Sequence, residues 1–299
     1  MPRIRTQLNA AGERLAARLA GPRPASGVDL VVAAALTEHG VSGLNDPAAY
    51  VDFLRSCWQP DPVEVTAHQG GGSALFAALL DHLASGMAPI PVDDAVRIGR
   101  ISDRLLSDRT PFDRPGSAVD VGVHAAVSSS FGHSGRLLTA VVRFMRSRTC
   151  LEIGTAYGLS ALFLAAALDR GHEPGSLTTV ECSEPQASLA FELLKEQHPG
   201  SVRTIRGRST EALPEVAADG QVFDLLFHDG EHSAAAYVAD FTAYEPHLAP
   251  GSVVLFDDIT WGDPAQGSDT LAGWTTLTRH ERVAQSVVLD GWYGLLLLH

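Results

Sequence analysis

Cysteine is scarce in this sequence, with Cys57, Cys150 and Cys182 the only three in 299 residues. An odd number of widely spaced cysteines argues against a disulfide framework and is typical of a reducing compartment. Long apolar runs are also absent, and the basic segment 1–21 is interrupted by Glu13. It therefore predicts an amphipathic helix rather than a signal peptide or a membrane span. We expect a cytoplasmic protein without a membrane partner.

Positive charge is the second deficit. There are 22 lysines and arginines against 35 aspartates and glutamates, so the formal net charge is −13. Nucleic acids and anionic lipid surfaces both require a basic face, and neither is expected as a partner. Arg143, Arg146 and Arg148 form a local basic cluster, which we interpret as a solvated helix face. The partner we expect is instead a small-molecule or natural-product substrate, whether free or bound to a peptide or carrier.

Residues 1–118 predict an all-α N-terminal domain or extension. Apolar residues recur at helical spacing in segments 27–40, 48–58, 72–86 and 92–107, separated by stretches rich in proline and glycine. The polar segment 107–118 is the predicted linker. These helices are candidates for a substrate lid, a recognition module or a dimer interface, and we expect a homo-oligomer.

Residues 119–299 have a different pattern, in which short apolar runs alternate with helical segments. Such alternation predicts a doubly wound α/β domain with a mostly parallel sheet. Asp290-Gly291 separates two apolar runs in the tail and predicts an antiparallel hairpin. We therefore expect a seven-stranded sheet. The predicted strands include residues 149–154, 176–182, 201–207, 222–229 and 251–258.

A cofactor pocket is predicted where the first strands of this sheet end, because ligands bind outside the carboxyl ends of parallel strands. Gly154 and Gly158 let a ligand approach the backbone closely, and Ser160 opens a helix whose amide hydrogens favour a carboxylate. The spacing is neither G-x-G-x-x-G nor a P-loop, so a dinucleotide is disfavoured. Glu181 ends the next strand, where a carboxylate accepts hydrogen bonds from ribose hydroxyls.

The segment 223–232, "FDLLFHDGEH", contains two histidines four residues apart, the spacing of a zinc pair on a helix. The apolar run before His228 predicts a strand instead, and Gly230 breaks any helix. Asp229 then lies at the carboxyl edge of the sheet, where Asp257 and Asp258 end the following strand. Three converging carboxylates repel one another unless a hard cation binds among them, and Mg²⁺ is the default. The alternative is that each aspartate simply caps a loop or helix.

From Ser128 to His299 the sequence resembles class I S-adenosylmethionine-dependent methyltransferases. The segments that carry the resemblance are 134–160, "TTVEC" at 178–182 and "TIRGRSTEALPEV" at 204–216. They resemble the metal-dependent O-methyltransferases of the catechol and caffeoyl-coenzyme A type, and those that modify antibiotic sugars. The resemblance implies a Rossmann-like fold and S-adenosylmethionine as cofactor. The cofactor-binding residues it implies are Ser130, Glu152, Gly154, Ser160, Glu181, Cys182, Arg208, Ser209 and Asp229.

The resemblance also implies a metal site at Asp229, Asp257 and Asp258. Asp258 departs from the catechol type, which has asparagine there, whereas the sugar-modifying type has an all-acidic site and a "DGxH" pattern. His232 matches the position of the general base, and imidazole titrates near neutrality. An exposed histidine at a helix start is the alternative. Trp261 is the predicted substrate-facing aromatic.

Together these features predict an O-methyltransferase that acts on a hydroxyl group, with a divalent metal and His232 as general base. Two alternatives stay open. One is a metal-independent N- or C-methyltransferase of a natural product or peptide, and the other is a scaffold that binds the cofactor without turnover. The carboxylates and His232 count against the scaffold, because it would need neither.

Overall fold

The computed structural model describes residues 27–39, 43–59, 62–112, 119–129, 131–171, 173–218, 220–262 and 269–299. The chain divides into two compact units. The first comprises Met1–Gln59 and Pro89–Ser134, and the second comprises Pro60–Ala88 and Gly135–His299. No helix in these ranges is long and apolar enough to span a bilayer. All three cysteines are unpaired.

The first unit is helical where it is described. Asp46 caps one helix by accepting hydrogen bonds from the amides of Ala48 and Ala49, and Pro47 takes the first helical position. Gly99 belongs to another helix and leaves no room for a Cβ atom, which would lie 2.8 Å from the Tyr50 ring. The small residue therefore permits close helix packing. The helices are α2 (Gly27–His39), α3 (Pro47–Trp58), α5 (Val92–Leu106) and α6 (Val121–Val127).

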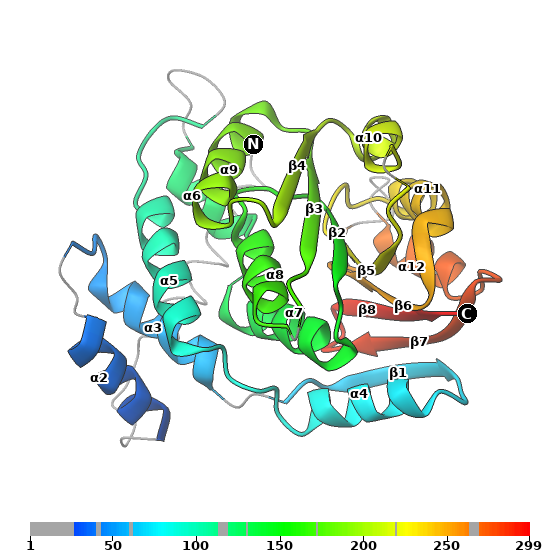
Figure 1. Ribbon diagram of the computed structural model, residues 1–299, viewed down its shortest axis with the longest axis horizontal. Helices are drawn as coiled ribbons and strands as arrows, with labels where there is room; N and C mark the ends of the chain where they lie inside the picture. The colour runs from blue at the N-terminus through cyan, green and yellow to red at the C-terminus, as the bar shows by residue number, and fades with distance from the viewer. Residues whose placement is uncertain are drawn as a thin grey trace. The chain divides into compact units, whose positions relative to one another are not determined.

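The second unit contains an eight-stranded sheet in the order β1-β7-β8-β6-β5-β2-β3-β4 among the described residues (Figure 1). Strands β6, β5, β2, β3 and β4 are parallel, whereas β8, β7 and β1 pair antiparallel. The strands are β1 (Val65–Gly70), β2 (Thr149–Ile153), β3 (Ser176–Glu181), β4 (Val202–Arg206), β5 (Phe223–His228), β6 (Leu248–Phe256), β7 (Val283–Leu289) and β8 (Tyr293–Leu298).

Helices cover both faces of the parallel strands, as right-handed crossovers require (Figure 1). On one face, Leu151 and Ile153 of β2 share a core with Tyr237 and Trp274. On the other, α8 is buried along nearly its whole length. The helices are α4 (Ala74–Ala84), α7 (Gly132–Met145), α8 (Leu159–Asp169), α9 (Glu184–Gln197), α10 (Ser209–Val216), α11 (Ala234–Tyr244) and α12 (Thr270–Leu277), with a short 3₁₀ turn at Glu245–His247.

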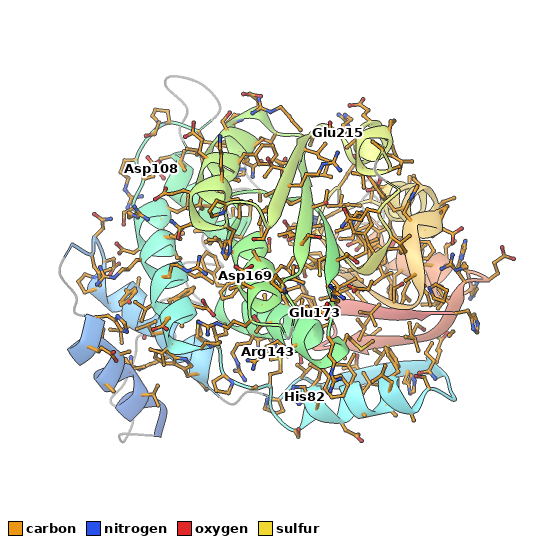
Figure 2. The ribbon with its side chains drawn as sticks, in the orientation of Figure 1. His82, Asp108, Arg143, Asp169, Glu173 and Glu215 are labelled. Atoms are coloured by element: carbon orange, nitrogen blue, oxygen red, sulfur yellow. The ribbon has the colours of Figure 1, made fainter. Side chains whose placement is uncertain are left out.

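The doubly wound, mostly parallel sheet and its terminal hairpin are as predicted. Asp290 and Gly291 both adopt positive φ, at 55° and 66°, in the loop between the paired residues Leu289 and Tyr293. The basic cluster is exposed as interpreted: Figure 2 shows Arg143, and Arg148 forms an ion pair with Glu173.

Two details of the predicted architecture need correction. The sheet has eight strands rather than seven, because β1 adds to its edge, so segment 1–118 is not all helical. Proline and glycine on either side of β1 hid a strand whose partner, β7, lies more than 200 residues away. The compact units also interleave in sequence, so they do not follow a single boundary at residue 118.

Candidate functional site

The predicted site residues come from strands whose carboxyl ends meet at one edge of the sheet. Ile153 of β2 is in register with Val180 of β3 and with His228 of β5, and His228 is in register with Phe256 of β6. The strand order reverses between β2 and β5, because β3 and β4 lie to one side and β6 to the other. This is the switch point at which open α/β sheets bind ligands.

The turn after β2 is tight. Gly154 has φ +95°, and a Cβ atom there would lie 2.0 Å from the carbonyl oxygen of Asp229. Glycine is therefore required because the backbone after β5 passes directly against it. Gly158 has φ +84° and starts α8, which places Ser160 in the first helical turn, 5% exposed.

Glu152 is fully buried beneath this turn. Its Oε2 atom accepts a hydrogen bond from the Thr179 hydroxyl, whereas Oε1 has no partner among the described residues. Burial raises the pKa of Glu152 from 4.5 to about 7, against the opposing effect of the nearby Thr179 and Ser160 hydroxyls. An orphaned buried acceptor suits an ammonium or N–H donor of a bound cofactor.

The raised pKa of Glu152 predicts a pH effect on stability. The folded state holds this proton above pH 4.5, so the stabilisation is complete below that pH and is lost as pH rises through about 7. Between about pH 5 and pH 8, wild type should lose up to about 3 kcal/mol of unfolding free energy relative to Glu152→Gln, which cannot titrate. Urea unfolding of both proteins across this range measures the difference, and parallel curves would contradict the assignment.

Glu181, at the end of β3, is 7% exposed and held by two backbone amides. Its Oε2 accepts from Ala156 N and its Oε1 from Ser183 N, both at 2.7 Å. Each carboxylate oxygen keeps a second lone pair, so the fixed side chain remains able to accept ribose hydroxyls. Cys182 follows it and is exposed.

The residues expected beside the adenine, Arg208 and Ser209, lie at the start of α10. Ser209 donates its hydroxyl to Asp240 Oδ1, and its carbonyl accepts from the Tyr244 hydroxyl at 2.5 Å. The Ser209 hydroxyl is thus committed within the protein. Arg208 is exposed, and its Nη1 lies 3.8 Å from Glu231 Oε2. Ser130 lies outside the described residues.

The three aspartates gather at the ends of β5 and β6. The backbone nitrogen of Asp229 donates to Ile153, and that of Asp257 donates to His228. Burial raises the pKa of all three carboxyls, and mutual repulsion raises those of Asp229 and Asp257 further. Asp258 adopts a left-handed backbone, φ +58°, and donates its amide to Asp257 Oδ1 at 2.8 Å. The cluster is therefore short of positive charge.

His232 lies between two of these carboxylates. Its Nε2 is 3.3 Å from Asp229 Oδ1 and 3.5 Å from Asp258 Oδ2. Its ring centroid is 6.2 Å from that of Trp261. The structure thus places His232 beside two of the predicted metal ligands, Asp229 and Asp258, and near the predicted substrate-facing Trp261.

The carboxylate oxygens are the donor type that Mg²⁺ prefers, and a cation would relieve their repulsion. Nevertheless, within the described part of the chain no three Asp, Glu, His or Cys side chains are arranged to hold a metal ion. The donor chemistry fits a divalent cation, while the ligand geometry is not assembled.

Several supporting residues were not predicted. Tyr237 donates its hydroxyl to the carbonyl of Asp257, and Asp240 Oδ2 lies 2.9 Å from His228 Nε2. The ring centroid of Trp292 lies 6.2 Å from that of Trp261, and the two rings meet edge to face. The sequence did contain a sign of the role of Asp240, because an acidic residue on the apolar face of a helix indicates a buried polar contact.

Comparisons with known proteins agree with this geometry. A family model described as a methyltransferase domain matches residues 151–259. A protein from Mycobacterium ulcerans (strain Agy99), named "Putative O-methyltransferase", is 31% identical over 170 residues, which cover 56% of this chain and 69% of the relative. A second protein of the same name, from Mycobacterium sp. (strain JLS), is 32% identical over 116 residues, which cover 38% of this chain and 49% of that relative. The chain thus spans about half the length of several curated relatives that it matches.

A solved structure shares the fold. The SAH-bound methyltransferase of Podospora anserina superposes with a TM-score of 0.54 and 16% identity, covering 78% of this chain and 99% of that one. At this identity the likeness bears on the fold alone.

Proposed function

This chain belongs to the class I S-adenosylmethionine-dependent methyltransferases, and we propose that it transfers the cofactor's methyl group to a hydroxyl oxygen of a small-molecule or natural-product substrate. The observation that carries the proposal is the position of His232 Nε2 between Asp229 and Asp258, at the same sheet edge as Glu181. The names of the relatives support transfer to oxygen.

The residues at the ends of β2 and β3 would bind the cofactor. Glu152 Oε1 and the first turn of α8 at Ser160 suit the amino and carboxylate groups of the methionine part. Glu181 suits the ribose, because two amides already fix its orientation. When bound, S-adenosylmethionine supplies an electrophilic methyl group, and the protein's part is to hold the acceptor oxygen in line with it.

His232 is proposed as the general base. A hydroxyl proton accepted by the imidazole ring would be stabilised by the two carboxylates, which lie 3.3 and 3.5 Å from Nε2. The ring of Trp261 beside it offers an apolar contact for the acceptor. Proton removal makes the acceptor oxygen a stronger nucleophile.

Asp229, Asp257 and Asp258 would hold a divalent cation, with Mg²⁺ as the first candidate. Such an ion would lower the pKa of the acceptor hydroxyl. The pKa values of all three carboxyls are raised mainly by burial, and repulsion between the carboxylates raises those of Asp229 and Asp257 further, which supports this assignment. A metal-independent methyltransferase is the second candidate, favoured by the lack of an assembled ligand set in the described residues. Activity that survives thorough chelation would establish it.

Cofactor binding tests the proposal. Calorimetric titration with S-adenosylmethionine should give saturable binding, and Glu181→Ala should weaken it by about 1.5–3 kcal/mol, the value of a hydrogen bond to a charged group. Glu184→Ala, three residues further along, removes an exposed glutamate paired with Arg206 and should leave affinity unchanged. A wild type that shows no binding would refute the proposal, and equal affinity of a folded Glu181→Ala would refute the role of that residue.

A further inference from the structure

A chain of hydrogen bonds crosses α11 and joins the ends of two strands. Asp240 is 3% exposed, and its Oδ1 accepts the hydroxyl of Ser209, which follows β4. Its Oδ2 lies 2.9 Å from Nε2 of His228, which is fully buried at the end of β5. The Asp240 carboxylate therefore contacts both the start of α10 and the last residue of β5, which directly precedes Asp229.

This carboxylate occupies a core position. Tyr237, Phe241 and Tyr244 are buried on the same helix, and an acidic side chain among them carries a desolvation cost that an apolar residue would avoid. The two hydrogen bonds offset that cost only while Ser209 and His228 keep their positions. The arrangement therefore fixes geometry more than it adds stability.

We propose that Asp240 is a positioning residue for the cofactor's adenosine part, acting through Ser209. The inference rests on the proposed function, because the turn at Ser209 serves a cofactor only if the chain binds one. Tyr244 also holds Ser209 in place, since its hydroxyl donates a hydrogen bond to the Ser209 carbonyl. Among the described residues no side chain caps α10, so the amides of its first turn stay available while their position is set by Ser209.

The other end of the chain reaches the acidic edge. The His228 ring lies 5.0 Å from that of Tyr237 and 5.1 Å from that of Phe256, and the Tyr237 hydroxyl donates to the Asp257 carbonyl. Loss of Asp240 would thus release the adenosine side directly and the acidic edge only indirectly, through His228. The larger effect is expected on adenosine binding.

The test compares S-adenosylhomocysteine with 5′-methylthioadenosine, which lacks the amino-acid end. Asp240→Ala should lower the affinity for both ligands by a similar factor, about tenfold, because both carry adenosine. Asp240→Asn keeps an acceptor for Ser209 and should restore part of the affinity. Asp169→Ala is the matched control: it breaks another His–Asp pair, His198 Nδ1 to Asp169 Oδ2 at 2.7 Å, at the end of α8 (Figure 2). Its affinity for both ligands should match wild type.

The outcomes separate the two proposals. If wild type binds neither ligand, the proposed function fails and the role of Asp240 fails with it. If wild type binds but a folded Asp240→Ala binds equally well, or loses affinity only for S-adenosylhomocysteine, only the positioning role is overturned. If Asp240→Ala does not fold, as thermal melting would show, Ser209→Ala decides. A loss of about tenfold supports the role, and unchanged affinity overturns it.

Discussion

Replacing His232 with alanine should slow methyl transfer by about 10²- to 10⁴-fold, the usual contribution of a general base. Its Nε2 lies 3.3 and 3.5 Å from two partly buried carboxylates, so alanine removes the proposed proton acceptor beside them. Cofactor binding should remain nearly intact, because Glu152 and Glu181 do not depend on this ring. The measurement is the single-turnover rate with saturating S-adenosylmethionine, alongside a calorimetric titration of the cofactor.

His68→Ala is the control for this substitution, since His68 is exposed on β1. It should leave the rate unchanged. Near-normal turnover of His232→Ala would show that another group, such as water, carries the proton away, and the base assignment would then be wrong.

Replacing Asp257 with alanine should produce a different kind of loss. Asp257 is 9% exposed and faces the charges of Asp229 and Asp258, so its removal takes away one of the three proposed metal ligands. Affinity for Mg²⁺ should fall by at least about 10- to 100-fold, a loss seen even for residues that only support a metal ligand. Activity should therefore fall at moderate magnesium and partly recover at high magnesium. In contrast, added magnesium should not restore His232→Ala.

Calorimetric titration with Mg²⁺ provides a readout that does not depend on activity. Wild type should bind the ion and Asp257→Ala should bind it more weakly. If wild type binds no divalent cation and stays fully active after chelation, the metal assignment is wrong. The metal-independent candidate would then stand.

Local patterns predicted the parallel sheet and the carboxylate edge well. Asp229 and Asp257 each follow an apolar run, and the ends of parallel strands meet at one edge, so their proximity followed from strand order alone. Glu181 was placed by the same reasoning. The hairpin at Asp290-Gly291 depended only on its turn residues.

Features that depend on distant pairing were missed. Strand β1 is defined by contacts such as Val65 with Leu289, and its flanking prolines and glycines indicated a break instead. The bond between Ser209 and Asp240 joins residues 31 apart on separate helices, and no short motif encodes it. The family resemblance placed Ser209 among the cofactor-binding residues, whereas the fold commits its hydroxyl to Asp240.

The most direct test of the central claim is the fate of the transferred methyl group. The full chain would be incubated with S-adenosylmethionine labelled with ¹³C at the methyl carbon and a panel of phenols, sugars and peptides, with and without Mg²⁺. The product carbon would then be assigned by NMR. We expect label on a hydroxyl oxygen of an acceptor, with a higher yield when Mg²⁺ is present. Label on nitrogen or carbon, or no transfer to any acceptor by a protein that binds the cofactor, would contradict it.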